Sequence, residues 1–405
     1  MRRLVVICGV AALAAFGALV GCQGYEFEVV KPKAVGTATQ SEPITGKQMP
    51  AKLMLVLDRS TSMMTPVGSN SGDGCGTSSA SYRPNSLDCK WNTLKQRLTA
   101  PDVGFLARTK DNVQHGLLLF TNPKDDTDLT CGVGSKLSNP INVEIADGPG
   151  QNVGDIAAEL DGTKPGGGTP TAAALGIVAK DNAFAAMEPS TRRYVLLITD
   201  GLPNCNSQLN GDTCVCTGAS QSDCRGEVRS CLDDNAMVQA VKNLHDLDKD
   251  PAGHGIDTFV VGFGAAFADD AAKKVLNDAA IAGGQPNTVP DPDKGLVSFY
   301  LADTQEKLDA VLDHVIAVIQ ACNFQLTPAP SDPQLLEVTV TKSDGSQVVL
   351  KKTTKDEPAK GDWYYDDADH VAITGTDPGG WCYKLQNDPP GSYTVNFLTV
   401  KSLGQ

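Results

Sequence analysis

The chain has 405 residues, a hydrophobic fraction of 41% and a formal net charge of -14. This length suits two or three ordinary domains, and the apolar content is sufficient for a packed core. We expect no nucleic-acid binding, because that function requires clustered Lys and Arg and the sequence contains no basic run. Metal ions and cationic partners suit the negative charge better.

The N-terminus is typical of an export signal. Arg2 and Arg3 precede an apolar run of roughly 16 residues, which is shorter than the ~20 residues of a membrane span. The segment LVGC at 19–22 resembles the lipobox of bacterial lipoproteins, and this resemblance implies cleavage before Cys22 and acylation of that residue. Gln23 then favours a lipid anchor in the outer membrane, with the cell surface as the expected side and the periplasmic face as the alternative. Ordinary secretory cleavage and an uncleaved anchor remain open.

Composition divides the chain into four parts. Residues 22–50 contain Pro, Thr, Ser and Gly with few large apolar groups, which is typical of a tether. An alternation of apolar runs and helical patterns follows, and after it comes a stretch of short alternating strands. The predicted boundaries are a signal peptide at 1–21, a tether at 22–50, an α/β domain at 51–322 and a small β module at 323–405.

The α/β domain is predicted to be doubly wound, with a mostly parallel sheet. Near-continuous apolar runs are what strands covered on both faces require, and helices between them indicate parallel crossovers. The predicted strands cover 52–58, 115–121, 193–200 and 256–264. The predicted helices cover 169–180, 235–247, 269–280 and 303–321.

Two polar insertions, 68–92 and 203–231, are rich in Gly, Ser, Asn and Cys and are predicted to be stapled surface loops. In an exported chain an even number of cysteines indicates disulfides, although the sequence does not choose the pairing. Five bridges are expected among Cys75, Cys89, Cys131, Cys205, Cys214, Cys216, Cys224, Cys231, Cys322 and Cys382. The alternative is a zinc cluster within 214–231, but its spacing is irregular and no His lies among the cysteines.

The last part of the chain reads as a small β module. Apolar residues alternate with polar ones over 336–340, Asp344-Gly345 supplies a hairpin turn, and further strand patterns cover 370–374 and 392–400. Four aromatic residues of this module are predicted to pack in its core and not to form a contact patch, because aromatic side chains dominate core burial. They are Trp363, Tyr364, Tyr365 and Trp381.

Oxygen-bearing side chains recur where strands of the α/β domain end. Asp58, Ser60 and Ser62 alternate after the first strand, Thr169 follows three glycines at the expected start of a helix, and Asp200 ends a later strand. Strand carboxyl ends meet at one edge of an open α/β sheet, which is where ligands bind. All five oxygens are therefore expected to converge there.

The segments LVLDRSTSM, GGGTPTAAAL and LLITDG resemble, in this order, the motifs of the von Willebrand factor A domain over residues 51–322. The resemblance implies a metal-ion-dependent adhesion site. Thr61 departs from the family's usual Gly, which stiffens the turn but removes no ligand. The implied ligands are Asp58, Ser60, Ser62, Thr169 and Asp200.

Hard oxygen ligands select Mg²⁺, Mn²⁺ or Ca²⁺. Only two of the five side chains are carboxylates, so a bound dication would keep affinity for a further anion, and a partner's Asp or Glu could complete its shell. An enzyme is not expected, because the five histidines are scattered, no G-x-S-x-G motif occurs and no Walker lysine follows the glycines at 166–168.

Metal-dependent adhesion to a carboxylate-bearing protein or surface is therefore the predicted function. The lipobox, motif trio and many cysteines also resemble the surface lipoproteins of myxobacteria, which implies partners among envelope and gliding-motility proteins. The alternative is a scaffold lipoprotein whose metal site binds a neighbour within an envelope or secretion complex.

Overall fold

The structure is a computed structural model that describes residues 39–402, apart from gaps at 49–50, 70, 123–129, 135–138, 187–190, 219, 248–254, 265–269, 292–294, 320–321, 355–356, 358–359, 366–367, 376–378 and 389–391. The predicted signal peptide and Cys22 lie outside the described residues. Within the described ranges, no helix is both long enough and apolar enough to cross a membrane.

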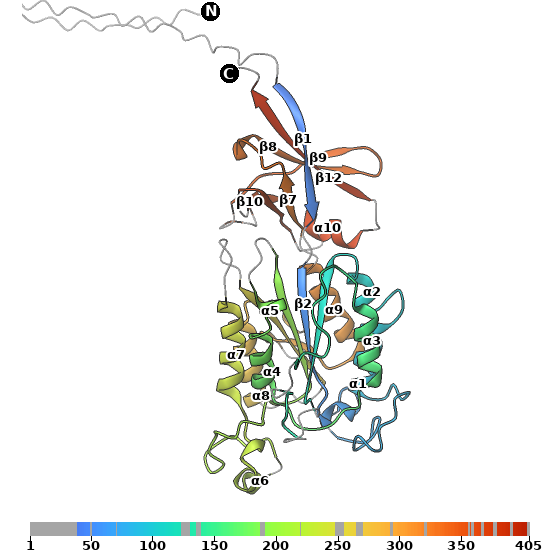
Figure 1. Cartoon of the computed structure of the whole chain (residues 1–405), viewed down its shortest axis with the longest axis vertical. Coiled ribbons are helices and arrows are strands. Elements are labelled where there is room, and N and C mark those ends of the chain that lie inside the picture. The colour runs from blue at the N-terminus through green and yellow to red at the C-terminus, as the bar shows by residue number, and fades with distance from the viewer. Residues whose placement is uncertain are drawn as a thin grey trace, which may run out of the picture. The chain divides into compact units, whose positions relative to one another are not determined.

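A five-stranded parallel sheet forms the centre of the α/β domain, which confirms the predicted fold class (Figure 1). Its strand order is β3-β2-β4-β5-β6. The strands are β2 (Ala51–Asp58), β3 (Val113–Phe120), β4 (Arg193–Thr199), β5 (Ile256–Phe263) and β6 (Tyr300–Ala302). Strands β2, β3 and β4 are buried along their whole length, as their apolar runs predict.

Helices cover both faces of this sheet (Figure 1). On one face Leu53, Leu55 and Leu57 pack against α1 (Lys90–Thr99), α2 (Phe105–Thr109), α3 (Val153–Gly162) and α9 (Gln305–Ile319). On the other face Met54 and Val56 pack against α4 (Thr171–Val178), α5 (Asn182–Ala185), α7 (Asp234–Asp246) and α8 (Asp270–Ala282). Successive residues of β2 thus serve two separate cores, as the period of two in a strand requires.

The ten cysteines pair as five disulfides, which confirms the expected bridges. The pairs are Cys75–Cys89, Cys131–Cys205, Cys214–Cys231, Cys216–Cys224 and Cys322–Cys382. Three sulfurs of the second insertion lie within 4.8 Å of one another, but two adjacent bridges account for this proximity without a zinc ion. The second insertion also contains helix α6 (Gln221–Gly226) and a short 3-10 turn, η2 (Val228–Ser230).

The β module is a seven-stranded sheet of order β10-β11-β7-β1-β12-β8-β9. Its strands are β7 (Asn323–Thr327), β8 (Leu336–Lys342), β9 (Gln347–Val349), β10 (Trp363–Tyr365), β11 (His370–Ile373), β12 (Tyr393–Ser402) and β1 (Thr39–Gln48), and helix α10 spans Trp381–Asn387. Trp363 is buried in the module's core, and Tyr365 and Trp381 pack against that core, as the packing interpretation expects.

Strand β1 corrects the predicted tether, which was expected to run through residue 50. Residues 45–48 pair with Phe324–Thr327 of β7, so the chain enters the β module before the α/β domain begins. The strand is hard to recognise in sequence because Ile44 is its only buried apolar residue among those whose burial is described. Backbone pairing, and not a row of apolar side chains, places it in the sheet.

Gly46 offers a test of this arrangement. A β-carbon at Gly46 would lie 2.1 Å from Cε2 of Phe397, which is buried on β12. We expect Gly46→Val to destabilise the protein by about 2 kcal/mol or more, because overpacking forces side chains and backbone to shift. Chemical denaturation measures the effect. Gly154→Ala is the control, since a β-carbon there meets nothing within 4 Å; an equal, small effect of both variants would contradict the placement of β1.

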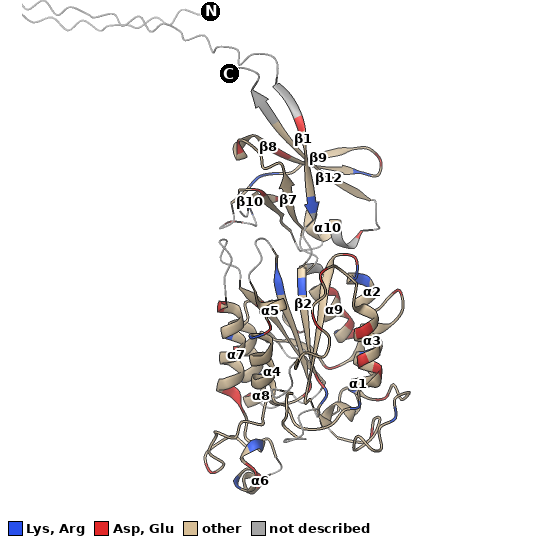
Figure 2. Ribbon diagram, viewed as in Figure 1, with Lys and Arg blue, Asp and Glu red and all other residues tan. Residues whose placement is uncertain are grey.

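Charged side chains are dispersed in the described part of the chain. Figure 2 shows Asp and Glu along helices α3 and α9, with Lys and Arg scattered.

Candidate divalent-cation site

The two candidate carboxylates lie at the same edge of the parallel sheet. Asp58 is the last residue of β2, and Asp200 directly follows β4, the strand that pairs with β2. Both are buried, with exposed fractions of 0% and 1%. The sequence expectation that strand carboxyl ends would bring these residues together agrees with this geometry.

Asp58 is held by hydrogen bonds to both of its oxygens. The backbone N–H of Ser60 donates to Oδ1 at 2.7 Å, and Oγ1 of Thr199 donates to Oδ2 at 2.6 Å. Burial and then the charge of Asp200 raise the pKa of Asp58 to about 7, although the hydrogen bonds from Thr199 and Ser60 oppose the shift. A cation between the two carboxylates would relieve this repulsion.

Two serine hydroxyls form a closely spaced chain of oxygens with the Asp200 carboxylate. Ser60 Oγ lies 2.9 Å from Ser62 Oγ, which donates to Asp200 Oδ1 at 2.7 Å. Neighbouring ligands in an octahedral Mg²⁺ shell are roughly 2.9 Å apart, because each lies about 2.0–2.1 Å from the ion. The observed spacing therefore fits adjacent positions around one small cation.

Thr169 completes the set from a third segment. The hydroxyl oxygens of Ser62 and Thr169 both lie 3.6 Å from the point that a β-carbon of Gly201 would occupy. Thr169 is buried and precedes α4, whose first residue is Thr171. The three sequence motifs thus place the five predicted side chains around one region. Both Asp58 oxygens already accept hydrogen bonds, which suits binding of the ion by Asp58 through a water molecule.

The Gly-rich segment is fixed to the loop after β2. Thr61 donates its backbone N–H to the carbonyl of Gly167 at 3.1 Å, and the Arg59 guanidinium donates to the carbonyl of Lys164 at 2.7 Å. Gly167 has φ +94, and a β-carbon there would lie 2.6 Å from Oγ1 of Thr121. Glycine is therefore required at this position by both conformation and space. Thr61, where the sequence motif usually has Gly, thus connects the loop after β2 to the Gly-rich segment.

Two residues that the sequence analysis missed take part in the site. Thr199 binds Asp58, and Lys90 donates from Nζ to Asp200 Oδ2 at 2.7 Å. Thr199 could have been noticed as the hydroxyl residue directly before Asp200. Lys90 gave only a faint signal, a lysine in the first turn of a helix, where the helix dipole disfavours positive charge.

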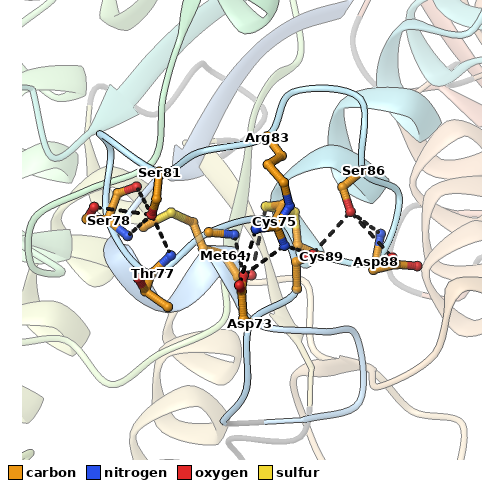
Figure 3. A network of polar contacts seen from close by, with 12 residues as sticks. Met64, Asp73, Cys75, Thr77, Ser78, Ser81, Arg83, Ser86, Asp88 and Cys89 are labelled. Atoms are coloured by element: carbon orange, nitrogen blue, oxygen red, sulfur yellow. Dashed lines mark hydrogen bonds and ion pairs between the residues drawn. A yellow bond between two sulfur atoms is a disulfide. The ribbon is translucent and has the colours of Figure 1, made fainter.

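In the chain, the first stapled loop lies between Ser62 and Lys90. Hydrogen bonds within this loop are numerous (Figure 3). Cys75, bridged to Cys89, donates its backbone N–H to the carbonyl of Met64 at 3.0 Å. Asp73 accepts from the Arg83 guanidinium at 2.8 Å. The predicted loop at 68–92 thus ends at Cys89, because α1 begins at Lys90.

The histidines that the structure describes make their contacts away from these oxygens. His115 lies 2.8 Å from Thr109 Oγ1, His245 lies 3.0 Å from an Asp257 oxygen, and His314 lies 3.1 Å from the Tyr300 hydroxyl. The fourth, His370, lies 3.0 Å from an Asp369 oxygen. Burial lowers the pKa of His115 to about 4, so this ring is neutral at pH 7.

Comparisons with known proteins give distant structural similarities. No protein-family model matches the chain, and no curated protein matches it. A variant of the PilB minor pilin from Streptococcus sanguinis is 16% identical with a TM-score of 0.42, over 68% of this chain and 62% of that chain. The pilus adhesin SpaC from Lactobacillus rhamnosus GG is 13% identical with a TM-score of 0.43, over 91% and 46%. The manganese-loaded TRAP protein of Plasmodium vivax is 14% identical with a TM-score of 0.36, over 68% and 76%.

The chain thus spans less than two thirds of the length of the pilin and of the pilus adhesin. The class of protein follows from its own geometry. It contains a doubly wound α/β domain with a candidate divalent-cation site at the carboxyl edge of its sheet.

Proposed function

We propose that the protein is a metal-dependent adhesion protein, in which a divalent cation on the five oxygens binds a carboxylate of a partner or surface. The observation that carries this proposal is the convergence of Asp58, Ser60, Ser62, Thr169 and Asp200 at one edge of the sheet. All five offer hard oxygen ligands, which suit Mg²⁺, Mn²⁺ or Ca²⁺.

The ligand's chemistry follows from the donor set. Three of the five donors are neutral hydroxyls, and a six-coordinate ion held by them and by the two aspartates, partly through water, keeps a position for another oxygen. An Asp or Glu side chain supplies both that oxygen and a negative charge. The bridged insertions at 68–92 and 203–231 are the proposed rim that selects the partner.

Calorimetric titration of Mg²⁺, Mn²⁺ and Ca²⁺ into the purified protein tests the site. We expect at least one ion to bind with a stoichiometry of one, and we expect Asp58→Ala to abolish that binding, because it removes one of two anionic groups. Asp278→Asn is the control, since it removes the same charge from a solvent-exposed ion pair with Lys274 on helix α8. Absence of binding in the unaltered protein would defeat the proposed function.

We propose that the site binds its ligand without catalysing a reaction. Metal hydrolases add a general base or a histidine-rich shell to the ion. The described histidines are engaged with Thr109, Asp257, Tyr300 and Asp369 instead. If cells carrying Asp58→Ala kept their attachment to surfaces but lost one envelope partner in a pull-down, the scaffold function would replace adhesion.

We further propose lipid anchoring at the outer membrane and a role like that of the adhesin lipoprotein of adventurous gliding motility in myxobacteria. The support is in the sequence: the LVGC segment at 19–22, the three site motifs and the bridged cysteines. We expect Cys22→Ser to release the protein into the soluble fraction, because it removes the acylation site. Unchanged membrane fractionation would contradict the anchor. Loss of gliding in Asp58→Ala cells that still export the protein would support the motility role.

A further inference from the structure

A buried lysine adjoins the candidate cation site. Lys90 Nζ lies 2.7 Å from Asp200 Oδ2, and the two side chains are only 1% and 0% exposed. The other oxygen of Asp200 accepts from Ser62. One carboxylate therefore faces the proposed ion through one oxygen and the lysine side-chain nitrogen through the other.

The local structure around Lys90 accommodates an ammonium that would otherwise be unfavourable. Lys90 opens helix α1, where the helix dipole disfavours a positive charge, and burial adds a desolvation cost. Gly264, with φ +111, leaves room for its stem, because a β-carbon there would lie 2.5 Å from Lys90 Cε. The ion pair with Asp200 is what offsets these costs.

The first stapled loop fixes the lysine in this position. The backbone N–H of Lys90 donates to the carbonyl of Thr65 at 3.1 Å, three residues beyond Ser62. Cys89, directly before it, is bridged to Cys75 (Figure 3). The backbone at the start of α1 is thus fixed to the loop after β2.

The charges define what Lys90 does. With both carboxylates ionised around a bound ion, Asp58 and Asp200 carry two negative charges, so a dication alone would neutralise them. With the Lys90 ammonium present, one positive charge remains. Like charges close together in a partly dry site repel by several kcal/mol. The lysine therefore weakens the binding of the ion and increases the demand for an anion from outside.

We propose that Lys90 is a resident counter-charge that couples metal binding to ligand binding: it keeps the divalent ion weakly bound until a carboxylate ligand joins it. This inference rests on the proposed function and deepens it. Lys90 is a positioning residue for Asp200 and a determinant of ligand charge. With this role of Lys90, a carboxylate and the metal ion are expected to strengthen each other's binding, because such coupling must be reciprocal.

The test compares Mn²⁺ affinity in the purified full chain and in Lys90→Met, which keeps the length of the side chain and removes its charge. We expect Lys90→Met to bind Mn²⁺ at least about tenfold more tightly. Lys90→Arg, which retains the charge, should stay within about threefold of the unaltered protein. Equal or weaker binding in Lys90→Met, or equal tightening in Lys90→Arg, would overturn the inference.

Acetate serves as the carboxylate probe at constant ionic strength. We expect acetate to tighten Mn²⁺ binding in the unaltered protein and to do so less in Lys90→Met; an undiminished acetate effect would also overturn the inference. If Lys90→Met fails to fold in chelator, it is refolded in millimolar Mn²⁺ and titrated back with EDTA. Failure to fold in both conditions would contradict the proposal, because Mn²⁺ should replace the lost charge.

Ion binding and the role of Lys90 can be disproved separately. If the unaltered protein binds no divalent ion, the proposed function itself is lost. If it binds an ion that Asp58→Ala abolishes, but Lys90→Met leaves the affinity unchanged, then only the role of Lys90 is lost and the lysine is a structural ion-pair partner.

Discussion

Asp200→Asn is expected to unfold more easily by about 3–5 kcal/mol and to lose divalent-cation binding. The substitution leaves the ammonium of Lys90 buried, 1% exposed, without its counter-charge, and breaking one partner of a buried pair has this typical cost. Loss of ion binding has a separate cause, since Asp200 supplies one of the two anionic ligands. Urea denaturation in the presence of EDTA measures the first effect, and calorimetry measures the second.

A double variant separates these causes. Lys90→Met combined with Asp200→Asn removes both charges, so most of the lost stability should return, because an apolar replacement of a buried pair is often neutral or stabilising. Ion binding should stay absent. If the double variant were as unstable as Asp200→Asn alone, the stability loss would come from the hydrogen bond with Ser62 and not from the unpaired lysine.

Much of the α/β domain could be predicted from the sequence, because its strands are continuous apolar runs. Strands β2, β3 and β4 are buried along their length, which leaves little ambiguity. Strand β6 is the exception: it has three residues, Tyr300–Ala302, and its pairing with β5 comes from the fold. Helix α1 was likewise hidden, because Lys90 and Asn92 are polar and yet buried through specific partners.

In the candidate site, too, some residues could be predicted from the sequence and others could not. Its five proposed ligands could be predicted because each lies in a contiguous motif after a strand or before a helix, and the resemblance to a known family set their order. Lys90 and Thr199 contribute through distant side-chain contacts, across 110 and 141 positions of the sequence. Such pairings depend on how the strands and loops pack, so a single sequence does not show them. Strand β1 was not predicted for a related reason, since its position depends on backbone pairing with β7.

The Cys131–Cys205 bridge is expected to control ion affinity as well as stability. Cys205 lies against the Gly-rich segment: a β-carbon at Gly168 would lie 2.8 Å from its sulfur. The backbone N–H of Gly168 also donates to the carbonyl of Thr130, next to Cys131, at 2.8 Å. The bridge therefore joins two segments that hydrogen-bond to Gly168 and Thr169, and its removal should loosen that ligand.

The double substitution Cys131→Ser and Cys205→Ser tests this role against Cys322→Ser and Cys382→Ser. The two bridges close loops of similar length, with separations of 74 and 60 residues, so loop-closure entropy predicts a similar stability loss of about 4 kcal/mol for each. Only the first variant should also bind Mn²⁺ more weakly, by about tenfold, since a looser ligand must be ordered on binding. Calorimetry at a temperature where both variants are folded makes the comparison. Equal Mn²⁺ affinity in the two variants would mean that the bridge stabilises the fold without positioning Thr169, and the hydrogen bonds between Thr169 and Asn204 would then be sufficient to hold it.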